Sequence, residues 1–167
     1  DLATGSHLML GSFFGYSPST DGRYFGIDNA VFAILSGCAV VVCAAVVDRA
    51  VHVPGTRDRT QTALVVAAVV AAVTIVVDGA PWMGADVGGI LTLVPVFGLT
   101  LWALAGHKID RRFLLAALGA GVVVLLAAVG ADALRSPDQR THIGRFFLGA
   151  GQGNGQLLTS TLAAKWQ

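Results

Sequence analysis

The side chains that could bind a ligand lie in short polar stretches beside long apolar ones. Asp78 and Asp86 flank a segment rich in turn-forming residues, and carboxylate oxygens are ligands that divalent cations prefer. Arginine suits phosphate, because its guanidinium group can form two parallel hydrogen bonds with one phosphate. The predicted substrate-binding residues are Arg23, Asn29, Asp78, Asp86, His142 and Arg145. Of these, Asp78 and Asp86 could also hold a divalent cation.

Acidic residues beside the apolar stretches differ in how much they need a partner. Asp28 and Asp86 come before such stretches, where a carboxylate can cap free N–H groups at the start of a helix. Asp78 and Asp132 come after them, where the helix dipole disfavours a carboxylate by a few tenths to ~1 kcal/mol. We therefore expect Asp78 and Asp132 to meet a cation, a polar ligand or an arginine. The candidate arginines are Arg23, Arg140 and Arg145.

Other chemistries receive less support from the sequence. Haem between helices usually requires histidines on facing helices, but His7 and His142 lie outside the apolar stretches, and His52 and His107 lie at their boundaries. Haem is therefore not expected. No nucleophile-elbow pattern marks a catalytic serine, so the catalytic residues and the question of enzyme activity stay open. A net charge of +1 gives no reason to expect a nucleic-acid partner.

The composition indicates a chain whose main solvent is lipid. Of its 167 residues, 54% are hydrophobic and only 13% are charged, against about 25% charged in a typical soluble domain. All ten acidic residues are Asp, which favours helix ends and turns. The abundance of Ala, Val, Leu and Gly favours helices that pack closely through small residues. We therefore predict an all-α polytopic membrane protein that contacts the lipid bilayer.

About four transmembrane helices are expected, because a spanning helix needs roughly 17–25 apolar residues. Asp28, Thr60, Asp86 and Asp110 are the predicted N-terminal caps of these helices. Pro95, inside the third stretch, deprives the Leu91 carbonyl of its helical donor and indicates a packed or mobile point. Gly84 with Gly88, and Ala85 with Gly89, repeat a spacing that permits close approach by another helix. The predicted spans are about 29–47, 60–77, 87–107 and 113–131.

The distribution of basic residues predicts the orientation. Loops 48–59 and 108–112 each carry three Lys or Arg residues, whereas loop 78–86 carries none. Cytoplasmic loops are enriched in Lys and Arg, so the first two loops are expected in the cytoplasm of a plasma-membrane protein. The N-terminal segment, loop 78–86 and the tail are then extracytoplasmic.

Three regions are expected along the chain. Residues 1–28 are too polar to span and too aromatic for a free linker, which favours an interfacial or re-entrant outer segment. Residues 29–131 form the four-helix transmembrane domain. Residues 132–167 form an extracytoplasmic tail with a Gly-rich connector. The abrupt ends of the sequence suggest a piece of a longer polypeptide.

Four motifs also carry a resemblance. They are Gly15-Tyr16-Ser17-Pro18, the run Gly22-Arg23-Tyr24-Phe25-Gly26-Ile27-Asp28-Asn29, the segment 78–89, and Thr141-His142-Ile143-Gly144-Arg145. With them, most of the chain resembles the multi-span C-terminal membrane region of a group of mostly actinobacterial integral membrane proteins. Those proteins carry an extracytoplasmic half similar to alkaline phosphatases, and the resemblance brings no established activity. Asp28 departs from the motif, where a small residue is usual, so the resemblance favours Arg23 and Asn29.

Three functions fit these observations. The first is a membrane domain of a bacterial cell-envelope protein, with an outward-facing polar pocket for a phosphorylated or lipid-linked envelope substrate. The second is a structural or assembly subunit that contacts other membrane subunits or the rest of a longer polypeptide. The third is a transporter or flippase component, which is disfavoured because the predicted span interiors hold no charged residue.

Overall fold

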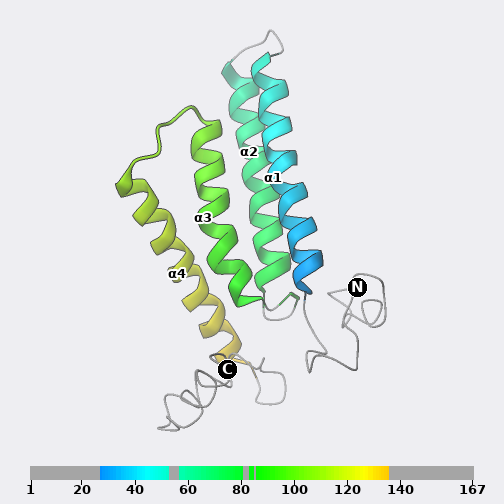
Figure 1. The fold of residues 1–167 in the computed structure, drawn as a ribbon, viewed down its shortest axis with the longest axis vertical. Helices are drawn as coiled ribbons and strands as arrows, with labels where there is room; N and C mark the ends of the chain where they lie inside the picture. Colours follow the sequence, from blue (N-terminus) through cyan, green and yellow to red (C-terminus); the bar gives the residue numbers. More distant parts are fainter. Residues whose placement is uncertain (1–26, 53–56, 81–82, 85, 136–167) are drawn as a thin grey trace, which may run out of the picture. The chain divides into compact units, whose positions relative to one another are not determined.

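The computed structural model describes residues 27–52, 57–80, 83–84 and 86–135, and their regular structure is entirely helical. The helices are α1 (Asn29–His52), α2 (Arg57–Gly79), α3 (Val87–Leu104) and α4 (Arg111–Ala133) (Figure 1). The predicted all-α class is confirmed for this part of the chain. Residues 1–26, which include most of the expected outer segment, and the tail from residue 136 lie outside it.

Three of the helices are long and apolar enough to cross a membrane, which supports an integral membrane protein. They are the 24-residue α1, the 22-residue part Asp58–Gly79 of α2, and the 23-residue α4. The apolar part of α3, Gly88–Leu104, is shorter. The expected third span therefore extends too far at its C-terminal end, because Gly106 adopts a left-handed φ of 79° that a helix cannot continue through.

The helix starts agree with two of the predicted caps. The Asp28 carboxylate accepts a hydrogen bond from the Ala30 N–H at 2.7 Å. The Asp110 carboxylate accepts one from the Phe113 N–H, also at 2.7 Å. The prediction for Thr60 is wrong, because α2 already begins at Arg57. Arginine is a good helix former, and an acidic residue in the first turn, here Asp58, is favoured by the helix dipole.

The chain divides within α4 into two compact units, residues 1–125 and residues 126–167. The described part of the first unit contains α1, α2, α3 and most of α4. That of the second contains the end of α4 and the residues up to Arg135. The predicted boundaries after residues 28 and 131 stay predictions.

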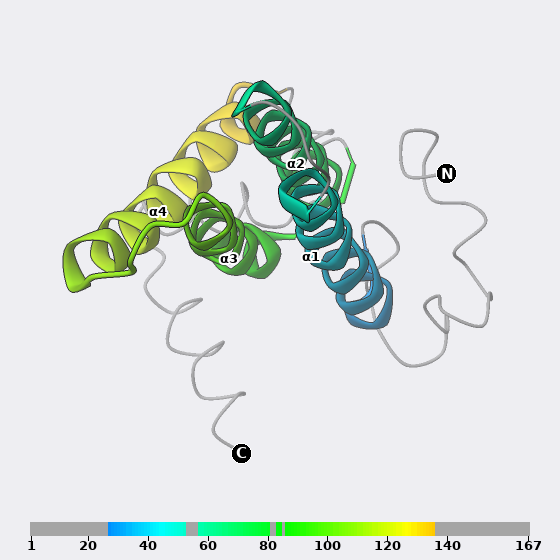
Figure 2. The same ribbon diagram turned by 90° about the horizontal axis from the view of Figure 1, so that it is seen from above.

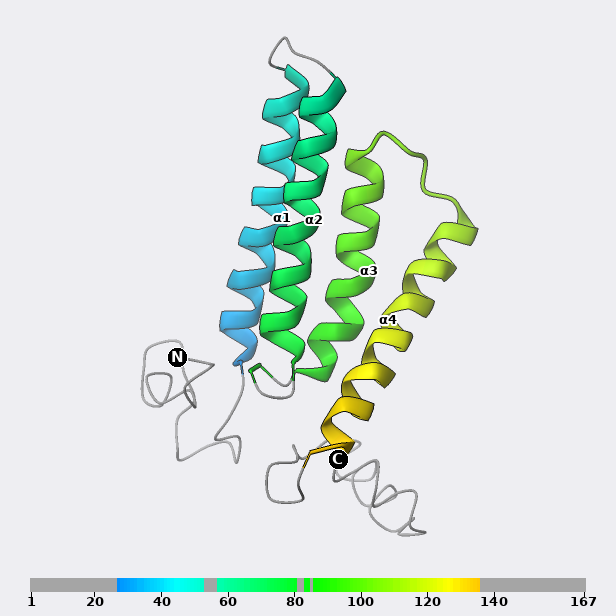
Figure 3. The ribbon, with the colours of Figure 1, turned by 180° about the vertical axis from the view of Figure 1, so that it is seen from behind.

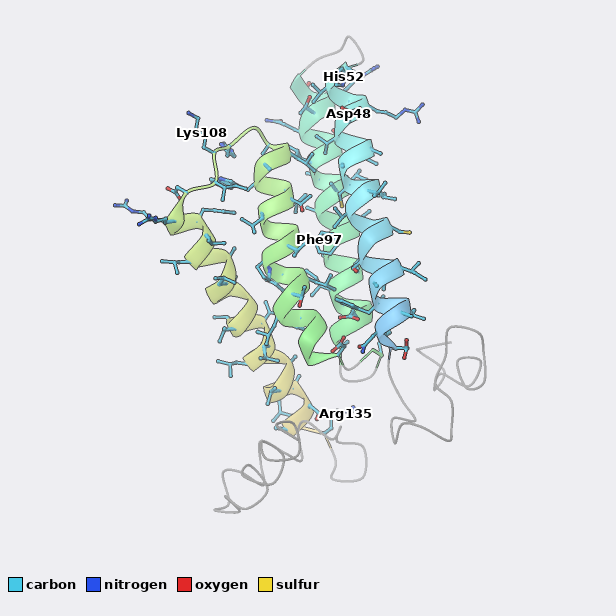
Figure 4. The ribbon with its side chains drawn as sticks, in the orientation of Figure 1. Asp48, His52, Phe97, Lys108 and Arg135 are labelled. Atoms are coloured by element: carbon cyan, nitrogen blue, oxygen red, sulfur yellow. The ribbon has the colours of Figure 1, made fainter. Side chains whose placement is uncertain are left out.

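Small side chains hold α1, α2 and α3 together in the first unit. Helix α2 contacts both α1 and α3, and the three lie side by side in Figures 2 and 3. At their centre the Cys43 thiol donates a hydrogen bond to the Ala67 carbonyl at 3.3 Å, which requires closely spaced backbones. Cys43 is buried in this contact, whereas Cys38, on the same helix, is exposed. The shared core is Ala39, Cys43, Val47, Ala63, Ala67, Ala71, Leu93 and Phe97, with Phe97 labelled in Figure 4.

A second close approach joins α3 to the first part of α4. A Cβ atom added at Gly121 would lie 3.4 Å from the Pro95 ring and 3.7 Å from the Leu91 carbonyl oxygen. Pro95 lies inside α3 and is buried. Because proline has no N–H, the Leu91 carbonyl has no helical donor. Gly121 thus lies where the backbone of α3 is interrupted, as expected for a packed point.

We expect Ala67→Leu to destabilise the α1–α2 contact, because Ala67 is fully buried and its carbonyl accepts the Cys43 hydrogen bond. Overpacking of a close contact costs about 1–3 kcal/mol. Ala68→Leu adds the same atoms at an exposed position of the same helix and should have little effect. Thermal unfolding in detergent, followed by circular dichroism, compares the two. Equal stabilities would contradict the close packing at Ala67.

Candidate functional site

The candidate site lies where α2 ends and α3 begins, and Asp78 is at its centre. The sequence places Asp78 in the loop after the second span, but α2 continues to Gly79, so Asp78 lies in its last turn. The Asp78 side chain is fully buried, with 0% of its surface exposed. The structure therefore encloses an acidic group that the sequence places in a loop.

Backbone hydrogen bonds fold the connecting segment back onto the end of α2. The Gly84 N–H donates to the Val77 carbonyl at 2.9 Å, and the Asp86 N–H donates to the Asp78 carbonyl at 3.0 Å. The chain just before α1 is also attached, because the Ile27 N–H donates to the Gly84 carbonyl at 3.2 Å. These bonds satisfy backbone groups at the end of α2 and hold three parts of the chain around Asp78.

Two glycines permit this close folding. A side chain at Gly84 would overlap the Asp78 backbone carbonyl, and one at Gly89 would overlap the Asp78 carboxylate. Gly84 lies before α3, and Gly88 on α3 is exposed. Of this glycine spacing, Gly84 and Gly89 permit close approach by the last turn of α2, whereas Gly88 meets no other helix among the described residues. Its structural consequence is a contact of Gly84 and Gly89 with Asp78.

The Asp86 carboxylate is directed towards the same place. Asp86 occupies the N-cap position of α3 in an extended backbone conformation, but its side chain makes no capping hydrogen bond. The predicted cap is thus correct in position and wrong in its interaction. A Cβ atom at Gly89 would lie 3.1 Å from Asp86 Oδ2 and would also overlap Asp78 Oδ2. The two carboxylates therefore converge beside Gly89, at the positive end of the α3 dipole.

Neither carboxylate oxygen of Asp78 has a hydrogen-bond partner among the described residues. Burial of an ionised carboxylate without a partner is strongly unfavourable, because the group loses its water and gains no compensating bond. Such a group in a folded protein calls for an explanation, and a ligand or ion is one of the standard explanations. Asp78 thus provides the expected acid in need of a partner.

Asp132, the other acid predicted to need a partner, has one in its own neighbourhood. Its carboxylate lies 3.4 Å from a guanidinium nitrogen of Arg135, and Asp132 is 2% exposed. The candidate arginines from the sequence did not include Arg135. The signal was available, because Arg135 follows Asp132 by only three residues, in the turn that ends α4.

The remaining predicted residues are not brought into the described site. Asn29 is exposed at the first position of α1, and Arg23, His142 and Arg145 lie outside the described residues. Within those residues, no group of three or more His, Cys, Asp or Glu side chains could hold a metal ion. The structure therefore brings together the carboxylates of Asp78 and Asp86, and a cation there would need further ligands.

We expect Gly89→Ala to destabilise the first unit more than Gly88→Ala. The added methyl group at Gly89 meets the buried Asp78 carboxylate, whereas at Gly88 its nearest neighbour is an Asp86 oxygen at 3.4 Å. The helix propensity gained is about 1 kcal/mol in each case, so the difference isolates the contact with Asp78. Unfolding midpoints measured in the same detergent provide the comparison. A Gly89→Ala midpoint at or above that of Gly88→Ala would contradict the packing described.

Comparisons with protein-family models, with curated proteins and with solved structures give no match to this chain. The interpretation of the site therefore rests on its own geometry and on the sequence motifs.

Proposed function

We propose that the chain is the membrane domain of a bacterial cell-envelope protein and that the region around Asp78 and Asp86 binds a phosphorylated or lipid-linked envelope substrate. The observation that carries this proposal is the buried Asp78 carboxylate, which has no hydrogen-bond partner among the described residues and lies beside Asp86. A protein that contains such a group without a ligand loses stability. A ligand-binding role accounts for its presence.

The chemistry of two adjacent carboxylates favours a positively charged intermediary. A divalent cation prefers oxygen ligands, and it commonly binds through one or two carboxylates together with substrate phosphate oxygens. A phosphate group could then complete the coordination of the cation. Arg23, Asn29, His142 and Arg145 are the proposed additional ligands, because guanidinium, amide and imidazole groups donate hydrogen bonds to phosphate oxygens. The motifs that contain them provide the second line of support.

A structural or assembly subunit is the alternative function. Large apolar side chains are exposed along α1, α2 and α4, as required for contact with lipid or with other membrane helices. The two functions differ in the expected role of Asp78. An assembly subunit has no need of an unpartnered buried carboxylate, so its replacement by a neutral group should be harmless there. A transporter or flippase component is the third possibility, and substrate-dependent flux in liposomes would favour it.

We expect Asp78→Asn to abolish ligand binding and cellular function while the protein still inserts and folds. Because an amide is less costly to bury than an unpaired carboxylate, the unfolding midpoint should rise by a few degrees. Asp86→Asn is the matched control for stability. Because Asp86 is only half-buried, the unfolding midpoint of this variant should change little. Function is scored by complementation. Binding is scored with a polyprenyl phosphate in nanodiscs, with and without Mg²⁺.

The results separate the alternatives. Loss of function with unchanged or increased stability supports a binding site at Asp78. Full complementation by Asp78→Asn contradicts the proposed site and favours the assembly role. A lower midpoint would mean that Asp78 contributes to folding through an interaction, and this would remove the observation that carries the proposal.

The proposed plasma-membrane orientation predicts opposite accessibility for the two ends of the first unit. Ile109→Cys, in the loop before α4, should be protected from a membrane-impermeant maleimide in intact cells and should react after lysis. Asn29→Cys, at the start of α1, should react in intact cells. Both positions are exposed on the protein, so protection reports the side of the membrane. Cys38 and Cys43 are replaced beforehand by serine and alanine. The reversed pattern would contradict the proposed orientation and place the Asp78 site in the cytoplasm.

A further inference from the structure

The loop between α3 and α4 is built around a tryptophan that makes three contacts. The Trp102 ring stacks on Phe113 of α4, with ring centres 4.3 Å apart and an angle of 17°. It also lies against His107 at 4.4 Å. Its ring N–H donates a hydrogen bond to the Lys108 carbonyl at 3.0 Å. One side chain thus fixes the end of α3, the loop and the first turn of α4 to each other.

The backbone of this loop is ordered by further bonds. The Gly106 N–H donates to the Ala103 carbonyl at 2.9 Å, and the His107 N–H donates to the Trp102 carbonyl at 3.2 Å. The left-handed conformation of Gly106 permits this turn. Asp110 then caps α4 through the Phe113 N–H. The loop is therefore a defined structure and not a simple connection.

Three cations project from this structure without an acidic partner among the residues that the structure describes. Lys108, Arg111 and Arg112 are exposed, and none of them takes part in an ion pair among the described residues. Figure 4 shows Lys108 on the loop, directed away from α1 and α2. The one nearby carboxylate in the sequence, Asp110, is engaged as a helix cap. The loop therefore presents uncompensated positive charge on a fixed frame.

The corresponding connection between α1 and α2 differs. Its basic residues are accompanied by two acids, and one of these, Asp48, pairs with His52 at 3.1 Å, as labelled in Figure 4. Asp58 lies in the first turn of α2, between Arg57 and Arg59. Equal numbers of Lys and Arg residues in the two connections thus give different local charge. The α3–α4 loop is the more strongly positive of the two.

We propose that the α3–α4 loop is a binding site for the phosphate head group of an anionic phospholipid. The loop joins two apolar helices, and α4 is long enough to cross a membrane, so the loop lies at a bilayer surface. Tryptophan is enriched at that level of the membrane, and Lys and Arg next to membrane helices bind anionic head groups. The stack of Trp102, His107 and Phe113 positions the backbone from which Lys108, Arg111 and Arg112 reach the phosphate. This site is independent of the function proposed for Asp78.

The test compares two pairs of substitutions with the same loss of charge. The full chain is reconstituted in phosphatidylcholine nanodiscs with increasing phosphatidylglycerol, and retained phosphatidylglycerol is counted by native mass spectrometry. Each basic residue near an anionic surface contributes about 1 kcal/mol, or about fivefold in affinity. Arg111→Gln with Arg112→Gln should therefore weaken binding roughly 25-fold at low salt. Arg49→Gln with Arg59→Gln should change it much less.

Two further variants separate charge from the loop structure. Arg111→Lys with Arg112→Lys keeps both charges and should retain most of the binding. Trp102→Ala keeps every charge but removes the stack and the bond to Lys108, so it should weaken binding if the frame positions the cations. The proposed site would be overturned if Arg111→Gln with Arg112→Gln and Arg49→Gln with Arg59→Gln weakened lipid binding equally, or if neither pair weakened it. Displacement of the lipid by millimolar inorganic phosphate would also overturn it, in favour of a site for free phosphate.

Discussion

The contact between the last turn of α2 and the first turn of α3 determines which groups surround Asp78 in the first unit. There the backbone of the connecting segment returns onto α2, and the Asp78 carboxylate is enclosed against Gly89. The enclosure is possible only because two positions carry no side chain. It leaves the Asp78 carboxylate without a hydrogen bond to any described residue, at a place where the Asp86 carboxylate also lies. The close packing of the helix connection thus encloses a carboxylate in a position that is unfavourable for its charge.

The helical core shows how a membrane chain compensates for a weak hydrophobic effect between its helices. Lipid tails are as apolar as the side chains, so helix association depends on close packing and hydrogen bonds. Alanines at the centre of α2 allow Cys43 of α1 to reach a backbone carbonyl, and Gly121 of α4 fits beside Pro95 of α3. The first contact holds α2 against α1, and the second holds α3 against the first part of α4. Asp78 and Asp86 lie where α2 connects to α3.

The two ends of α3 have opposite chemistry. At its start, the buried Asp78 of α2 and the half-buried Asp86 bring two carboxyl groups together beside Gly89. At its end, the Trp102 stack supports a loop with exposed positive charge. A buried acidic position selects a specific cation or cationic group, because a buried charge requires a close partner. An exposed basic loop favours a surface such as the lipid head groups. The proposed substrate and the proposed lipid therefore bind by different physical means.

The sequence alone determined the helical class, the approximate positions of the four described helices and two of the helix caps, because these depend on local properties. A long apolar stretch must form a helix in lipid, and an aspartate before it bonds to N–H groups within the next few residues. It also singled out Asp78 as an acid in need of a partner, from the direction of the helix dipole. The end of α3 was missed, because the turn at Gly106 depends on a backbone conformation that an apolar pattern does not reveal.

Only the tertiary structure decided what surrounds Asp78. Its burial requires the segment before α3 to fold back, and that depends on bonds between residues far apart in the sequence, such as Ile27 with Gly84. The roles of Gly84 and Gly89 follow from the same folding, since the spacing of glycines does not state which group will approach them. Asp132 differs from Asp78 for a local reason, because Arg135 lies three residues away. A partner three residues away can be read from the sequence, whereas the burial of Asp78 becomes evident only when the helices are packed.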